Sequence, residues 1–324
     1  MCLNIGNKPS ALVVFDTNVY RDLAANRSRD EALTLLESIK NAEKSKAYIP
    51  QFSITVAREL ISHFIDDENT KGYKECTLGA ELQYRHCQNE QGQIWILPTP
   101  EEQLSHCFYS VQNKEAIEWQ YAIMEIGNDL LRGTYKEVIA NYTDTISGIV
   151  KFLEMVEEDL LRYIQEFLLA WNPNYKGDWN AFKDKGIKKE YFTYLKKEKE
   201  DIFHEIADTR LKEIRDDLSR QYIKYVYSPK LLHKNLDIYV NSFRSSLEME
   251  YQMLEKLPNG IHMDKEAKRN IVWDEQILMV LPNTSKGIPF KLVTSDKGML
   301  SAAKASGLQD KICTRQEYMK DLGL

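Results

Sequence analysis

The hydrophobic pattern near the start of the chain alternates between strands and helices. Residues 11–16 (ALVVFD) are an uninterrupted apolar run that ends in an acid. Continuous β-branched and aromatic residues without polar alternation predict a parallel strand covered on both faces. The following patterns predict a helix, a short strand and a second helix, over 30–44, 47–50 and 53–64.

The same alternation returns near the other end of the chain. Its patterns predict a helix start, a buried strand, a helix and a short last strand, over 273–281, 290–294, 297–307 and 311–314. Strands that alternate with helices are typical of α/β proteins. Both ends therefore favour one α/β domain with a central, mostly parallel sheet.

The middle of the chain has a different pattern. It is charged and Tyr-rich, and its apolar residues recur with a period of 3.6, which predicts helices over 114–140, 144–170, 188–225 and 235–256. We therefore predict an α/β domain formed by residues 1–100 and 263–324, with a large all-helical insertion at 101–262.

Composition and charge argue against several classes of protein. The chain has 324 residues, of which 43% are hydrophobic and 28% charged, so a folded core is expected. Its net charge of −6 gives no overall positive field, and binding to nucleic acid would require local basic patches. The five cysteines include no C-x-x-C pair, which argues against a disulfide framework or a zinc knuckle. No signal peptide or membrane span is recognisable, so we expect a cytoplasmic protein.

Four acidic residues stand at the ends of predicted elements. Asp16 and Asp296 each follow a buried strand, at the edge where open parallel sheets bind ligands. Glu59 lies within a predicted helix and Asp274 begins another. Each also has an ordinary structural explanation, because Asp caps helices and favours helix N-termini, and Glu59 suits a solvated helix face.

If these four acids lie close together in the folded chain, they need a nearby cation, since neighbouring carboxylates raise one another's pKa. Ligation by oxygen alone selects hard divalent ions such as Mg²⁺ or Mn²⁺. Such ions serve phosphoryl-transfer chemistry, in which they activate water and neutralise phosphate charge.

The order and context of the four acids resemble the PIN domain family of metal-dependent nucleases. The matching segments are "FDTNVY" with Asp16, "SITVAREL" with Glu59, "WDEQIL" with Asp274 and "VTSDKGM" with Asp296. The resemblance covers roughly residues 11–66 and 270–315. Many family members carry a further acid where this chain has Gly298, and the insertion is longer than in the compact members. The chain looks closer to larger bacterial PIN-like proteins.

The resemblance implies a three-layer PIN-like fold and a catalytic metal site for one or two ions. Asp16 would be the central ligand, Asp274 and Asp296 would complete coordination, and Glu59 would bind a second ion or position the attacking water. Asn18, Thr294 and Ser295 would orient these ligands by hydrogen bonds. His63, one turn beyond Glu59, is not assigned as a general base.

A basic and aromatic segment at 183–199 is the candidate nucleic-acid-binding region. It contains seven lysines against three acids, with aromatic residues between them. This composition favours contacts with phosphates and bases, although an ordinary solvated helix has the same composition. The predicted contacts to nucleic acid, which is RNA in the implied function, are Lys188, Lys189, Lys196 and Lys197.

Two rival functions stay open at this point. A phosphatase or phosphotransferase with an Asp nucleophile typically has a D-x-D arrangement, but here Asn18 occupies the second position. Alternatively, the chain is a catalytically inactive PIN-like scaffold that acts through the helical insertion. The sequence does not decide between RNA and DNA, the cleavage preference, the pathway, or whether the chain binds itself or a regulatory protein.

Overall fold

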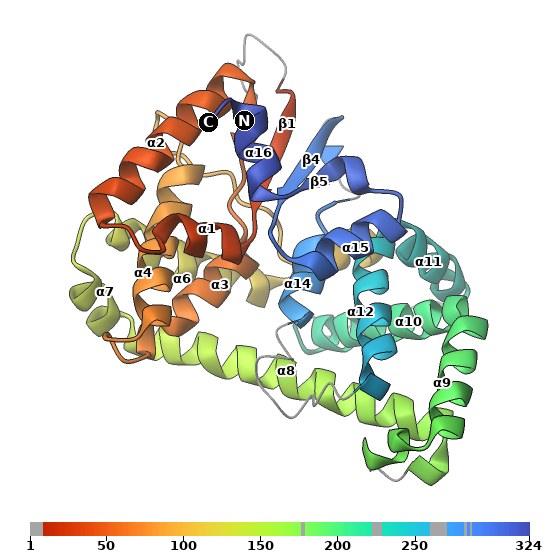
Figure 1. The fold of residues 1–324 in the computed structure, drawn as a ribbon. Helices are drawn as coiled ribbons and strands as arrows, with labels where there is room; N and C mark the ends of the chain where they lie inside the picture. The colour runs from red at the N-terminus through yellow and green to blue at the C-terminus, as the bar shows by residue number, and fades with distance from the viewer. Residues whose placement is uncertain (1–8, 176–178, 222–228, 260–270, 282–283, 286) are drawn as a thin grey trace.

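The computed structural model describes residues 9–175, 179–221, 229–259, 271–281, 284–285 and 287–324 (Figure 1). Its sheet has the strands β1 (Ala11–Phe15), β2 (Tyr48–Pro50), β3 (Thr284–Ser285), β4 (Ile288–Val293) and β5 (Ile312–Cys313). The parallel strands follow the order β2-β1-β4-β5, and the short β3 is antiparallel to β4. The structure is therefore α/β with a helical part, and the predicted mostly parallel sheet is confirmed.

The central strand β1 is buried throughout, as its continuous apolar sequence predicts. All five residues of β1 are buried, and Phe15 pairs with Val293 of β4. Helices from both ends of the chain cover the sheet: α1 (Thr17–Ala24), α2 (Arg29–Ser45), α3 (Ile54–Ser62), α4 (Lys71–Cys87), α14 (Ile271–Leu278), α15 (Lys297–Ala305) and α16 (Arg315–Leu322). In Figure 1, α1, α2 and α4 lie on one side of the strands, and α14 and α15 lie on the other.

Local capping explains where several of these helices begin. Ser28 and Thr314 form reciprocal capping boxes with Glu31 and Glu317 at the starts of α2 and α16. Ser53 accepts a hydrogen bond from the backbone of Val56 at the start of α3. These bonds satisfy backbone N–H groups that have no partner within the helix.

The middle of the chain is helical, and its helices are α5 (Pro100–Leu104), α6 (Lys114–Leu130), α7 (Tyr135–Asn141), α8 (Thr143–Trp171), α9 (Lys185–Lys197), α10 (Lys199–Gln221), α11 (Pro229–Ser242) and α12 (Arg244–Lys256). The helix predicted over 144–170 is confirmed as α8. The single helices predicted over 114–140, 188–225 and 235–256 are wrong, because breaks near Gly133, Glu198 and Phe243 divide them. Residues 222–225 and the predicted boundary at 262–263 lie outside the described residues.

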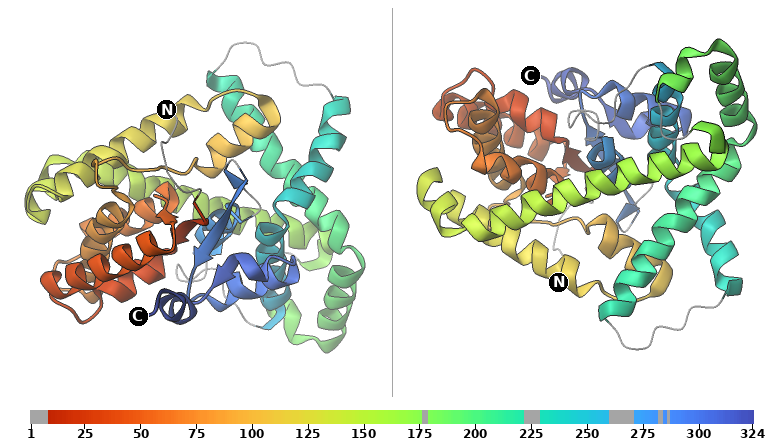
Figure 2. Two further views of the ribbon diagram at one scale, coloured as in Figure 1. Left: turned by 90° about the horizontal axis from the view of Figure 1, so that it is seen from above. Right: turned by 90° about the horizontal axis from the view of Figure 1, so that it is seen from below.

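The helical part packs against the helices that carry three of the four predicted acids. Helix α8 contacts α3, and α12 contacts both α14 and α15. Figure 2 shows α8 crossing the molecule, so that it lies against segments from both ends of the chain. No described helix combines the length and the apolar character that crossing a membrane requires.

Candidate acidic site

The pairing of β1 with β4 places Asp16 at the site. Its backbone N–H donates to the Val293 carbonyl over 3.0 Å, immediately after the last residue of β1. Although Asp16 is the N-cap residue of α1, its side chain makes no capping hydrogen bond. Its Oδ2 instead accepts hydrogen bonds from Thr294 Oγ1 at 2.7 Å and Asn18 Nδ2 at 3.5 Å. The carboxylate therefore faces the neighbouring strand end.

Asp296 occupies the equivalent position after β4 and also caps α15. Its Oδ1 accepts a hydrogen bond from the Met299 N–H at 2.8 Å, and its own N–H donates to Thr294 Oγ1 at 2.9 Å. Asp296 thus caps α15, as its position suggested, but it does so through only one of its carboxylate oxygens. Thr294 links Asp16 and Asp296, because its hydroxyl contacts both residues.

Glu59 and Asp274 approach from helices. Glu59 is half-buried in α3, and its Oε2 accepts a short hydrogen bond of 2.5 Å from Thr17 Oγ1. Thr17 directly follows Asp16, so this bond ties α3 to the end of β1. Asp274 lies in the first turn of α14 and is also half-buried. A fully solvated Glu59 is therefore excluded.

The pKa values show that the four acids share one electrostatic environment. Burial, with a smaller contribution from the charge of Asp296, raises the pKa of Asp16 to about 6, although hydrogen bonds from Thr294 and Asn18 lower it. The pKa of Glu59 is raised to about 7 by burial and by Asp16. Burial also raises the pKa of Asp274 to about 9, with added repulsion from Asp16, Asp296 and Glu59. Four acids from remote parts of the chain are thus brought together.

The site has little positive charge from the protein. Within the described ranges, none of the four acids forms a salt bridge with Lys or Arg. Arg21 lowers the pKa of Glu59, but its guanidinium lies 3.6 Å from a different acid, Glu75. The charge of the four acids is therefore left largely uncompensated by the residues that the structure describes.

The four acids supply only oxygen donors, a set that fits Mg²⁺ or Mn²⁺. Among the residues that the structure describes, however, no group of three or more His, Cys, Asp or Glu side chains is arranged to hold a metal ion. Mg²⁺ normally keeps several waters and binds one or two carboxylates directly. The donor set therefore fits a hydrated ion better than a closed cage of four carboxylates.

Only some of the residues that were predicted to orient the acids by hydrogen bonds lie in contact with them. Thr294 and Asn18 both hydrogen-bond to Asp16, whereas Ser295 is exposed and makes no such bond to the acids among the described residues. His63 pairs with Asp66 at 2.8 Å, consistent with its not being assigned as a base. Thr17, which orients Glu59, was not predicted, although it belongs to the quoted segment "FDTNVY".

The helical part holds α14 through the residues on both sides of Asp274. Trp273 Nε1 donates to Glu157 of α8 at 3.3 Å. Glu275 accepts a hydrogen bond from Ser246 and lies 3.5 Å from Arg210. These contacts fix the first turn of α14, and with it the backbone that carries Asp274.

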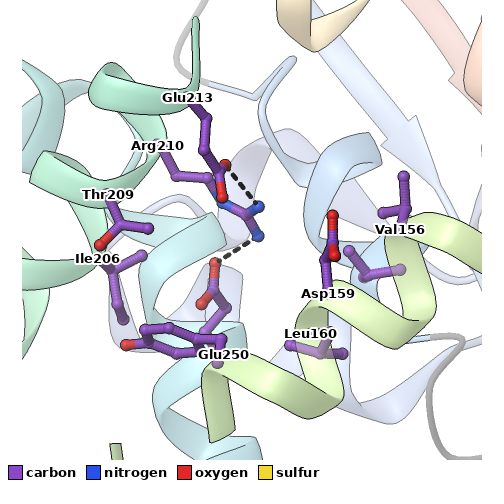
Figure 3. A pocket seen from close by; sticks show the side chains of 10 residues that line it. Val156, Asp159, Leu160, Ile206, Thr209, Arg210, Glu213 and Glu250 are labelled. Atoms are coloured by element: carbon purple, nitrogen blue, oxygen red, sulfur yellow. Dashed lines mark hydrogen bonds and ion pairs between the residues drawn. The ribbon is translucent and has the colours of Figure 1, made fainter. Parts of the chain in front are cut away.

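Arg210 is shared by several acids beside a small cavity of about 30 Å³, which Figure 3 shows from close by. Its guanidinium lies 3.4 Å from Glu250 and 3.5 Å from Glu213, in addition to its contact with Glu275. Burial raises the pKa of Glu250 to about 7. Because Arg210 contacts Glu275 of α14 as well as Glu250 of α12, this cluster of charged side chains holds α14 against α10 and α12.

The predicted lysines are spread over two sides of α9. Lys189 and Lys196 are exposed, and Lys188 Nζ donates to Asn259 Oδ1 at 2.7 Å. Lys197 instead pairs with Glu198 at 2.5 Å. Lys185, which was not predicted, lies on the same side as Lys188, Lys189 and Lys196.

We expect the metal-free protein to lose stability as pH rises from about 5 to 8. The raised pKa of Asp274 means that the folded state keeps a proton that the unfolded state has released, so each pH unit lowers the unfolding free energy by about 1.4 kcal/mol for this one group. Urea unfolding of wild type and Asp274→Asn at several pH values measures the effect. The variant should show the flatter dependence, and equal slopes would contradict the raised pKa.

Comparisons with known proteins give no further guide to the site. No family model matches the chain, and neither the search of curated proteins nor that of solved structures finds a match.

Proposed function

We propose that the chain is a metal-dependent nuclease with a PIN-like fold, which hydrolyses phosphodiester bonds, preferentially in RNA. The observation that carries this proposal is the gathering of Asp16, Glu59, Asp274 and Asp296 around the ends of β1 and β4, with raised pKa values at Asp16, Glu59 and Asp274 and no salt-bridged cation among the described residues. Such a site gains stability from a divalent cation. Mg²⁺ or Mn²⁺ held there would neutralise phosphate charge and activate water.

The chain's own residues would orient the reacting groups. The hydroxyl of Thr294 fixes Asp16 from one side, while Thr17 fixes Glu59. The pKa of Glu59, about 7, allows its carboxylate to accept a proton from water near neutral pH. Glu59 is therefore the residue that we assign to positioning water, and Asp16 is the central cation ligand.

A divalent cation and Asp296 are both expected to be required for cleavage of pooled cellular RNA. Asn caps helices as well as Asp does, so Asp296→Asn keeps the start of α15 and removes only the charge. We expect about hundredfold slower cleavage in Mn²⁺. The matched control is Asp310→Asn, an exposed acid outside the site.

The outcomes of this assay separate the rival functions. Equal cleavage by wild type and Asp296→Asn would remove the assigned site. Hydrolysis of a small phosphoester without cleavage of RNA would favour a phosphatase. An inactive scaffold should neither cleave RNA nor bind Mn²⁺ in a manner that depends on Asp16. The lack of a closed metal cage among the described residues would suit such a scaffold.

A further inference from the structure

One side of α9 carries a surplus of positive charge beside a shallow hollow. The hollow has a volume of about 440 Å³. Its lining residues recur every three or four positions, so they form a single helix face: Lys185, Lys188, Lys189, Phe192, Thr193 and Lys196. We call this set the α9 face. No acid lines it, and Figure 1 shows α9 at the outer edge of the helical part.

The charge of the α9 face is not balanced by neighbouring acids. Within the described part of the chain, none of its four lysines forms an ion pair, and the hydrogen bond of Lys188 goes to the neutral amide of Asn259. The basic residues of the next helix differ, because Arg210, Lys212 and Arg215 are each paired with an acid. In a chain of net charge −6, the α9 face is thus a local positive patch.

An aromatic side chain lies between the cations. Phe192 is half-buried and lines the hollow, while its neighbour Tyr191 is buried and donates a hydrogen bond to the Leu254 carbonyl at 3.1 Å. Tyr191 therefore anchors the helix, and Phe192 offers a ring to a ligand. From Lys185 to Lys196 the face is about 17 Å long at 1.5 Å per residue.

We propose that the α9 face is a binding site for single-stranded RNA, distinct from the acidic site and supporting it; this proposal rests on the proposed nuclease function. Lysines in a row attract successive phosphates, and an aromatic ring stacks on an unpaired base. A double helix would not offer its bases to Phe192. The combination of four lysines, which form no ion pair with any described residue, and one ring in a hollow therefore favours a single strand.

Binding is tested with the full chain in EDTA, where metal-dependent cleavage does not occur. The probe is a fluorescein-labelled 20-nucleotide poly(U), measured by anisotropy at several salt concentrations. The triple variant Lys185→Gln, Lys189→Gln, Lys196→Gln should lose at least about tenfold in affinity, and its log–log salt slope should shrink by about 2. Phe192→Leu should weaken binding about tenfold with an unchanged slope.

The matched control replaces three exposed lysines on other helices, Lys136, Lys151 and Lys304, by Gln. It should bind like wild type. Equal binding by the α9 triple variant and wild type, an equal loss in the control, or binding to anionic phosphatidylserine vesicles instead of poly(U) would overturn the proposal.

Cleavage in Mn²⁺ distinguishes this inference from the proposed function. The α9 triple variant should cleave a 20-nucleotide RNA more slowly than wild type but a tetranucleotide equally well, because α9 lies at the outer edge of the helical part, away from β1 and β4 (Figure 1), and we expect the short substrate to occupy the acidic site alone. Lysine-dependent binding without any cleavage would refute the nuclease and keep the α9 site. Cleavage of both lengths unaffected by the triple substitution would refute the α9 site and keep the nuclease.

Discussion

Asp16→Asn is expected to lower Mn²⁺-dependent RNA cleavage by about a thousandfold and to raise the stability of the metal-free protein. Asn keeps the shape of the side chain but removes a charge that interacts with each of the other three acids. Loss of a central ligand removes several kcal/mol of cation and transition-state binding, and each 1.36 kcal/mol is a factor of ten. The same change removes the cost of ionising a buried carboxyl.

The two effects are measured on the same samples. At pH 7.5 the shift in the pKa of Asp16, from 3.8 to about 6, corresponds to about 3 kcal/mol, so urea unfolding in EDTA should show a gain of about 1 to 3 kcal/mol. Added Mn²⁺ should stabilise wild type and leave the variant unchanged. Loss of cleavage accompanied by loss of stability would instead indicate that Asp16 is a structural residue.

Gly127→Ala is expected to destabilise the protein by about 3 to 5 kcal/mol. A Cβ at this position of α6 would lie 1.6 Å from the ring of Tyr84, which is impossible without moving that ring. Tyr84 is fully buried, donates a hydrogen bond to the Ile123 carbonyl and packs on Phe52 with ring centroids 4.6 Å apart. Displacement would cost both the bond and the packing between α4 and α6.

Urea unfolding of Gly127→Ala, with Gly72→Ala as the control, tests the close approach of Gly127 to Tyr84. Gly72 also lies in a helix, near the start of α4, but there the nearest atom to a new Cβ is 3.8 Å away. Ala has the higher helix propensity, so Gly72→Ala should be neutral or slightly stabilising. Similar unfolding free energies for Gly127→Ala and wild type would show that Tyr84 has room to move.

The strands were predictable from the sequence because burial on both faces leaves a direct local signal. β1 is a continuous apolar run for that reason, whereas β4 includes Lys291 and is buried only at Phe290, Leu292 and Val293. Helix α4 was missed because several of its polar residues, among them Glu75, Glu81 and Gln83, are buried, so they do not mark an exposed face. Its buried Glu81 is balanced by Arg29 and Arg85, a tertiary arrangement that local spacing does not reveal.

The acids of the candidate site were predictable as positions on elements, but their environment was not. The hydrogen bonds from Thr17 to Glu59 and from Thr294 to Asp16 depend on how remote segments pack. In α9, a lysine-rich sequence did not specify which lysines share a face. The structure places Lys185 beside the hollow and pairs Lys197 with Glu198, because α9 ends at that point.

The adjacency of β1 and β4 also has a consequence for biosynthesis. Asp16 and Thr294 are in contact although they are 278 positions apart in the chain. A ribosome must therefore translate the message past the codon for Asp296 before the acidic site has all four carboxylates. Products of interrupted translation that end before Asp274 would lack two of them, so the proposed nuclease would become active only after both parts of its α/β domain have been synthesised.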